Sequence, residues 1–268
     1  MSVSLHPVTD LVSLLDLEVV KPDAFLGVSP AIGWDRIYGG QVVAQALRAA
    51  GLTVAPEYRA HSLHAYFVRP GDEKAPVLFE VERVRDGRSF CTRQVIASQA
   101  GGAILNLIAS FQVEEAGPDV QRVEMPAGVA PPDAFEPMET TLFMDHRVIS
   151  VVRDPQPHEL SWMRVPEPLG EGPMVHACAL AYLSDEDLLG VALLPHPSGG
   201  EWDSMMAASL DHAVWFHRPI RSDEWLLFSI EGHGVANARG MGIAQVFDRA
   251  GAHVATVAQE GLGRIRRS

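Results

Sequence analysis

The pattern of apolar positions predicts a buried helix followed by strands. Residues 39–51 (GGQVVAQALRAAG) combine helix-forming Ala and Leu with a closing glycine, and they are apolar on almost every side. A helix without a polar face has to be buried. β-branched and aromatic runs bounded by turn residues then predict strands over 61–68, 77–84, 90–99 and 104–113. We expect one helix lying on a long antiparallel sheet.

The second half of the chain repeats the first at a constant offset of 149 residues, the distance from Phe67 to Phe216. The same offset relates three pairs of segments: 66–70 (YFVRP) to 215–219 (WFHRP), 78–82 (LFEVE) to 227–231 (LFSIE), and 102–105 (GAIL) to 251–254 (GAHV). Three matches in one register predict a duplicated domain.

A stretch rich in proline and acidic residues separates the two copies. It runs from residue 114 to residue 173, and its later parts, 147–151 and 160–165, have the composition of strands that open the second copy. We therefore expect an N-terminal domain over 1–113, a linker over 114–145 and a C-terminal domain over 146–268.

The composition of the chain limits which binding partners and which cellular compartment we expect. The formal net charge of -13 would repel a phosphate backbone, so we expect no nucleic-acid partner. No stretch reaches the roughly 18 apolar residues that cross a bilayer, which predicts no membrane insertion. The two cysteines, Cys91 and Cys178, lack the spacing of a redox or metal motif and fit a reducing compartment. We expect a cytoplasmic protein.

A cluster of arginines places positive charge in one region, although the net charge of the chain is negative. These are Arg83, Arg85, Arg88 and Arg93. They are able to bind the phosphates of an anionic ligand such as coenzyme A, or they occupy solvated positions on exposed strand faces. The residues themselves leave both interpretations open.

Four sequence blocks resemble the type II acyl-CoA thioesterases of bacteria and peroxisomes. They are 38–47 (YGGQVVAQAL), 61–72 (HSLHAYFVRPGD), 85–90 (RDGRSF) and 211–219 (DHAVWFHRP), and the resemblance extends from about Gly33 to the C-terminus. It implies an α+β double hotdog, that is, two tandem hotdog domains, each with a buried central helix wrapped by an antiparallel sheet. It also implies hydrolysis of fatty acyl-CoA to free fatty acid and coenzyme A by a homodimer or homotetramer. We expect no cofactor and no metal.

In that family an Asp, a Thr or Ser, and a Gln position a hydrolytic water. The matching residues here are Asp185, Ser209 and Gln259. In this interpretation Asp185 is the general base, and Ser209 and Gln259 orient the water toward the thioester carbonyl. Serine keeps the hydroxyl that threonine supplies elsewhere in the family.

Asp185 also stands out on physical grounds. If residues 174–189 form one helix, Asp185 lies on the same face as Cys178, Tyr182 and Leu188. A carboxylate on an apolar face needs a partner or a wet cavity, and both are common at functional sites. Alternatively the helix ends near Ser184, and residues 185–187 form a solvated acidic turn.

The offset indicates that only the C-terminal copy carries the chemistry. Gln259 corresponds to Ser110, and Ser209 corresponds to Ala60, so the first copy lacks the amide and the hydroxyl. Backbone N–H groups near Gly40 and Gln41, at the start of the first helix, are candidate donors to the oxyanion of the substrate. The glycines there are equally compatible with a tight entry turn that binds no ligand.

Other functions are less consistent with the sequence. Neither the serine-hydrolase motif G-x-S-x-G nor the zinc motif H-E-x-x-H occurs. His212 and His217 are five residues apart on a predicted strand and point to opposite faces, so they cannot share a metal. The Asp-x-Asn-Pro-x-His segment of hotdog enoyl-CoA hydratases is absent. A catalytically silent acyl-CoA-binding protein is the other alternative.

Overall fold

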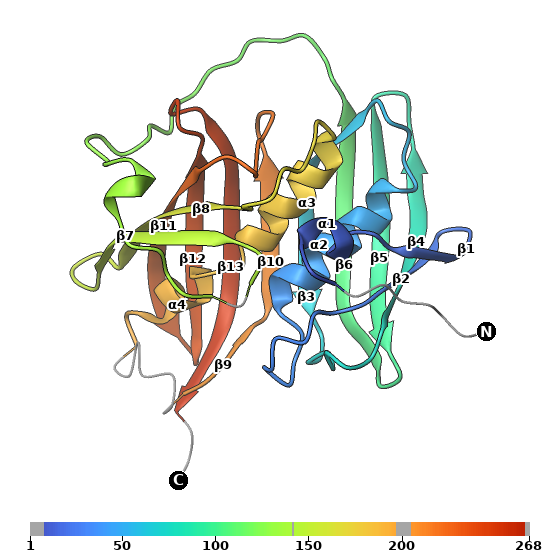
Figure 1. Ribbon diagram of the computed structural model, residues 1–268, viewed down its shortest axis with the longest axis horizontal. Coiled ribbons are helices and arrows are strands. Elements are labelled where there is room, and N and C mark those ends of the chain that lie inside the picture. The colour runs from blue at the N-terminus through green and yellow to red at the C-terminus, as the bar shows by residue number, and fades with distance from the viewer. Residues whose placement is uncertain (1–7, 141, 197–204, 266–268) are drawn as a thin grey trace.

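The computed structural model describes residues 8–140, 142–196 and 205–265. Its strands form one antiparallel sheet, and two helices lie side by side on the same face of that sheet (Figure 1). These helices are α2 (Gly39–Gly51) and α3 (Pro173–Leu183).

The elements fall into two series along the chain. The first series also contains α1 (Leu11–Leu14), β1 (Glu18–Lys21), β2 (Ala24–Gly27), β3 (Tyr58–Phe67), β4 (Val77–Asp86), β5 (Phe90–Gln99) and β6 (Gly102–Val113). After a short 3₁₀ turn, the second contains β7 (Asp145–Val152), β8 (His158–Arg164), α4 (Leu188–Leu193), β9 (Met205–Ser209), β10 (Asp211–Phe216), β11 (Leu226–Ala236), β12 (Arg239–Phe247) and β13 (His253–Ile265).

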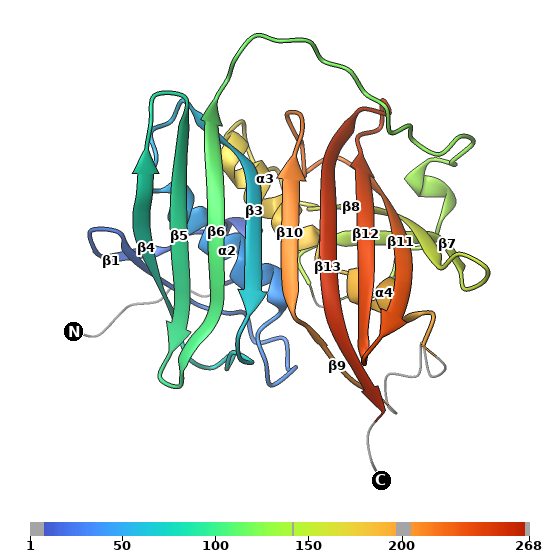
Figure 2. The same ribbon diagram turned by 180° about the vertical axis from the view of Figure 1, so that it is seen from behind.

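The order of strands across the sheet is mirrored about its centre. One side reads β4-β5-β6-β3 and the other β10-β13-β12-β11, with β3 and β10 paired antiparallel at the junction (Figure 2). Tyr66 lies opposite Asp211 there, and Ser62 lies opposite Trp215. The sheets of the two halves are therefore continuous.

Helix α2 begins and ends where the sequence predicts, and it is buried along its length. Its two glutamine side chains donate hydrogen bonds to neighbouring groups. Gln45 Nε2 donates to the carbonyls of Leu14 and Val28, at 3.0 and 3.1 Å, and Gln41 Nε2 donates to Ser29 Oγ at 2.8 Å. These hydrogen bonds connect the helix to residues 14–29, for which the sequence predicted no helix or strand.

The helix predicted over residues 174–189 is wrong in its length. Helix α3 ends at Leu183, and Asp187 has the left-handed backbone angle φ of 59°, which interrupts the helical path before α4. The alternative, in which the helix ends near Ser184, is confirmed for the helix end, but its solvated acidic turn is wrong, because Asp185 Oδ1 is buried. The turn is enclosed because the start of α2 packs against it.

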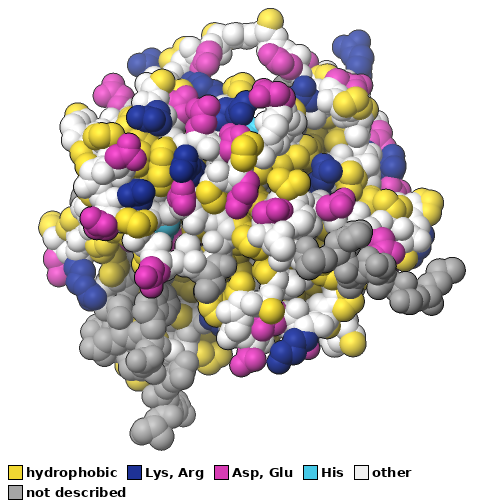
Figure 3. Space-filling model, in the orientation of Figure 1, with side chains coloured by type: hydrophobic (Ala, Val, Ile, Leu, Met, Phe, Trp, Pro, Cys, Tyr) yellow, Lys and Arg dark blue, Asp and Glu magenta, His cyan; other side chains and the backbone are white. Residues whose placement is uncertain are grey.

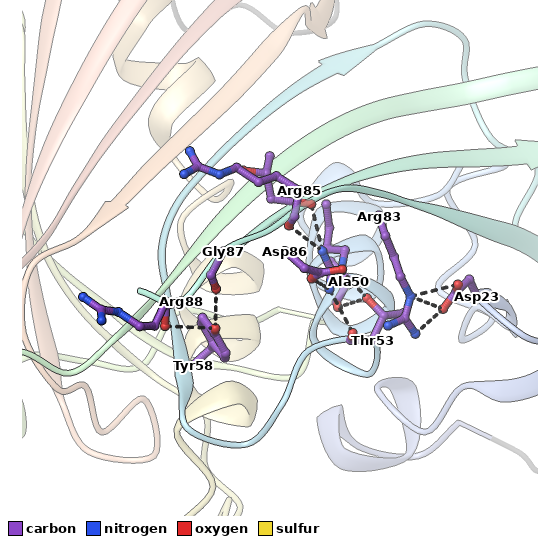
Figure 4. Close-up of polar contacts among 11 residues, drawn as sticks. Asp23, Ala50, Thr53, Tyr58, Arg83, Arg85, Asp86, Gly87 and Arg88 are labelled. Atoms are coloured by element: carbon purple, nitrogen blue, oxygen red, sulfur yellow. Dashed lines mark hydrogen bonds and ion pairs between the residues drawn. The ribbon is translucent and has the colours of Figure 1, made fainter. Parts of the chain in front are cut away.

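The four arginines have different environments. Arg83 forms an ion pair with Asp23 at 2.8 Å, whereas Arg93 is only 1% exposed and donates to Thr53 Oγ1 at 2.8 Å. Solvation, one of the two interpretations, is therefore wrong for Arg93. The exposed side chains of Arg85 and Arg88 extend away from this network (Figure 4). All four lie near the C-terminal end of α2, about 16 Å of helix from Gly40.

Charged side chains of both signs share the surface, and both cysteines are free thiols. Acidic and basic side chains are interspersed over the face shown in Figure 3, without a basic stripe on that face. Cys91 and Cys178 are buried and unpaired. Within the described ranges, none of the helices has the length and hydrophobicity to cross a membrane.

Candidate active site

The candidate site lies where the N-terminus of α2 meets the C-terminus of α3. The Gly40 N–H donates to Asp185 Oδ2 at 2.8 Å, and Tyr38 Oη donates to the Tyr182 carbonyl at 2.9 Å. A Cβ on Gly40 would come within 2.5 Å of that carbonyl, and one on Gly39 within 2.7 Å of Asp185 Oδ2. The glycine pair therefore permits the close approach of the two helix ends.

The Asp185 carboxyl group is buried and only half satisfied. Its Oδ1 atom has no hydrogen-bond partner among the described residues. Burial raises the pKa of Asp185, and the His212 ring, the Gly40 N–H and the Gln259 amide each oppose that rise. Such a carboxylate is a stronger base than one in water, and one of its oxygens faces an unmet hydrogen bond.

The sheet side of the site is a chain of hydrogen bonds centred on Gln259, which is fully buried. Its Nε2 donates to Ser209 Oγ at 2.6 Å, and its Oε1 lies 2.7 Å from His212 Nδ1. Because Oε1 can only accept, Nδ1 of the ring carries a proton, and Nε2 of the same ring lies 2.9 Å from Ser184 Oγ. The chain thus links β9, β10 and β13 to the end of α3.

The structure brings the three predicted residues together. Asp185 comes from the turn after α3, Ser209 from the end of β9, and Gln259 from the middle of β13. Ser209 and Gln259 are in direct contact, and Gln259 is close enough to the Asp185 carboxyl to lower its pKa.

The backbone N–H groups that are candidate oxyanion donors differ in whether they already have an acceptor. The Gly40 N–H is already bonded to Asp185. The first helical hydrogen bond runs from Val42 N to the Tyr38 carbonyl, and in the described chain the N–H groups of Gly39 and Gln41 have no acceptor. The Gln41 side chain points to Ser29 instead, so only the backbone of Gln41 is available.

Two members of the network were not assigned a role in the site from sequence. The sequence only excludes His212 from sharing a metal with His217, and it names Ser184 only as the helix end in the alternative interpretation. The available signal was the adjacency of His212 to the Ser209 segment and of Ser184 to Asp185. Their contact joins residues 28 positions apart, which neither periodicity nor spacing reveals.

The first copy has a different set of groups at the equivalent place. Ser110 Oγ lies 2.8 Å from His61 Nε2, and burial lowers the pKa of His61. A surface pocket of about 300 Å³ opens beside them, at the far end of α3 near Met174 and Phe216. The carboxylates that line it, Glu114 and Glu115, follow strand β6, whereas Asp185 follows a helix.

Two family descriptions match the chain. "Acyl-CoA thioesterase" covers residues 145–262, and "Acyl-CoA thioesterase N-terminal domain" covers residues 28–112. The chain is 37% identical to acyl-coenzyme A thioesterase 8 of Mus musculus, over 95% of this chain and 88% of that protein.

Solved structures give the same picture. The acyl-CoA thioesterase II TesB2 of Mycobacterium marinum is 39% identical, with a TM-score of 0.85 over 96% of this chain and 98% of its own. A protein of unknown function with a hot dog fold from Alicyclobacillus acidocaldarius is 20% identical, with a TM-score of 0.81 over 97% of this chain and all of its own, and supports the fold alone. The fold is of the hotdog type.

Proposed function

Since the chain belongs to the acyl-CoA thioesterase family and is a thioester hydrolase, we propose that it cleaves fatty acyl-CoA with a water held by Asp185, Ser209 and Gln259. The observation that carries the proposal is the convergence of a half-satisfied buried carboxylate with the Gln259–Ser209 pair.

The proposed reaction needs only these groups and the substrate. Asp185 takes a proton from the water as the water oxygen bonds to the thioester carbon. The backbone N–H groups of Gly39 and Gln41 donate to the resulting oxyanion, aided by the positive end of the α2 dipole. The C–S bond then breaks, and the departing thiolate takes the proton from Asp185. The products are a free fatty acid and coenzyme A.

The proposal includes a division into two tandem hotdog domains, residues 1–113 and 146–268, joined by a linker over 114–145. The mirrored strand order supports it. So does a shared irregularity: β3 is bulged between Ala60 and Ser62, and the break between β9 and β10 at Leu210 comes 149 residues after His61. The C-terminal domain carries Asp185, Ser209 and Gln259.

Coenzyme A binding by the arginine cluster is not part of the proposal. Arg83 and Arg93 are engaged with Asp23 and Asp86, and the cluster lies at the opposite end of α2 from Gly40. A homodimer or homotetramer in the cytoplasm is proposed from the family resemblance and from the two unpaired cysteines.

The decisive experiment measures free-thiol release from acyl-CoAs of increasing chain length. The wild-type chain should release thiol, and Asp185→Asn should be slower by about 100-fold or more while still binding acyl-CoA by calorimetry. Normal hydrolysis by Asp185→Asn would refute the mechanism. Binding without thiol release by the wild type would favour the silent acyl-CoA-binding protein, and hydration of an enoyl-CoA would favour the hydratase.

A further inference from the structure

A second group of buried polar side chains lies beside the candidate site and is not used by the proposed reaction. His146 on β7, Glu159 on β8 and Asp187 before α4 each have a buried side-chain atom without a hydrogen-bond partner: Nε2, Oε1 and Oδ2, respectively. Ser161 Oγ, two residues along β8 on the same face as Glu159, is also buried and unpartnered. Unpartnered buried polar atoms are rare, and four in one place call for an explanation.

The geometry of these atoms suits a metal ion. One nitrogen or oxygen atom from each of His146, Glu159 and Asp187 lies within 4.8 Å of the other two. His146 Nε2 and Asp187 Oδ2 are 2.8 Å apart, yet they are not aligned for a hydrogen bond. Two ligands that each lie about 2.0–2.2 Å from one ion are separated by about 3 Å, and they point at the ion rather than at each other.

Burial argues against a chance surface cluster. His146 is 2% exposed and Glu159 is 7% exposed, and the Asp187 side chain is 14% exposed. The three residues come from two paired strands and from the turn after α3, so the sheet and the turn hold them against each other.

The local charge is unfavourable without a cation. Glu186 and Asp187 are adjacent in the chain, and one carboxylate oxygen of Asp187 lies within 4.8 Å of one of Glu159. Asp185 adds a further carboxyl group in the same turn. A divalent cation among these groups would offset their mutual repulsion.

We propose that His146, Glu159 and Asp187 form a binding site for a divalent transition-metal cation of the Zn²⁺ or Mn²⁺ type. One imidazole nitrogen with two carboxylates favours such ions over Ca²⁺ and Mg²⁺, which prefer all-oxygen sites. Three protein ligands leave a further position for water or for the Ser161 hydroxyl. The ion would connect β7 and β8 to the turn that carries Asp185, and so would act as a structural link.

The test is metal binding by the full chain after removal of bound ions with a chelator. Isothermal titration with Zn²⁺ and with Mn²⁺ should give one equivalent of binding, and elemental analysis after desalting should recover one ion per chain. The absorption spectrum of a Co²⁺-loaded sample should show mixed nitrogen and oxygen ligation. Glu159→Gln and His146→Gln should each weaken binding at least tenfold and abolish the metal-dependent rise in melting temperature.

Matched controls come from β11. Glu231→Gln and His233→Gln alter an exposed pair 4.0 Å apart and should leave binding unchanged. Melting curves of the metal-free variants establish that each one folds. The proposal is overturned if the wild type binds no ion, or if Glu159→Gln and His146→Gln bind as the controls do. The four atoms would then be satisfied by buried water or shared protons.

Discussion

Gln259 uses both ends of its amide, and this makes it more than a space-filling residue in β13. Its Nε2 and Oε1 contact Ser209 and His212 at 2.6 and 2.7 Å, and the His212 contact requires a proton on Nδ1 of the ring. A buried amide in a strand of small apolar residues is therefore the centre of the network rather than its edge.

Replacing Gln259 tests whether the chemistry is confined to one copy. Gln259→Ala should lower turnover about 100-fold, because the water and the Ser209 hydroxyl lose their positioning partner. Ser110→Ala, at the equivalent position of the first copy, should stay near the wild-type rate. Thiol-release kinetics measure both variants, and circular dichroism checks their folding. Equal losses in the two variants would contradict the assignment to the C-terminal copy.

Two substitutions at Ser209 distinguish the role of its hydroxyl group from that of its side-chain volume. Ser209→Ala leaves the Gln259 Nε2–H without its acceptor and should cost about 1–3 kcal/mol of unfolding free energy, together with activity. Ser209→Thr keeps the acceptor and should retain most of the activity. Denaturant unfolding and thiol release measure the two effects. A Thr variant as impaired as the Ala variant would mean that volume, not the hydroxyl, matters.

The start of α2 leaves no room for side chains at residues 39 and 40. Two helix ends of opposite partial charge meet there, and the Asp185 carboxylate accepts a hydrogen bond from the positive one. The contact is close because residues 39 and 40 lack side chains.

A single methyl group should disturb this junction. Gly40→Ala would set a Cβ 2.5 Å from the Tyr182 carbonyl and 2.6 Å from the Tyr38 ring, and we expect a loss of about 1–3 kcal/mol and of most of the activity. Gly101→Ala is the control, because no atom lies within 4 Å of its Cβ position. Thermal melting and thiol release measure both. Unchanged melting and turnover in Gly40→Ala would show that the helix ends can separate without cost.

The outer face of the continuous sheet exposes apolar side chains on neighbouring strands. Tyr66, Ile96 and Ile108, on β3, β5 and β6, are 65%, 40% and 43% exposed. Such a face is typical of surfaces that associate, which is consistent with the proposed homodimer or homotetramer.

The oligomer can be tested on that face. The double variant Tyr66→Lys with Ile108→Lys should lower the molar mass measured by light scattering toward that of one chain, because two charges would have to be buried. Val151→Lys with Val152→Lys, on the exposed end of β7, is the control and should keep the wild-type mass. A wild-type chain that is already monomeric would contradict the proposal.

The local sequence pattern was sufficient to predict the bounds of elements whose environment is uniform along their length. Helix α2 and strand β5 were predicted with the bounds that they have, because a helix buried on all sides and a strand between turn residues need no distant partner to be recognised. The family resemblance likewise predicted Asp185, Ser209 and Gln259 as site residues, and the 149-residue offset showed that the first copy lacks the amide and the hydroxyl.

Only the tertiary structure determined that the acidic turn, residues 185–187, packs against the start of α2. The sequence left two interpretations of residues 185–187 open, and it gave no sign that their partner is the start of α2, about 145 residues away. The same holds for Ser184 with His212, and for the proposed metal ligands His146, Glu159 and Asp187. Each group is assembled from separate strands and turns, and contacts between distant segments are set by packing rather than by spacing along the chain.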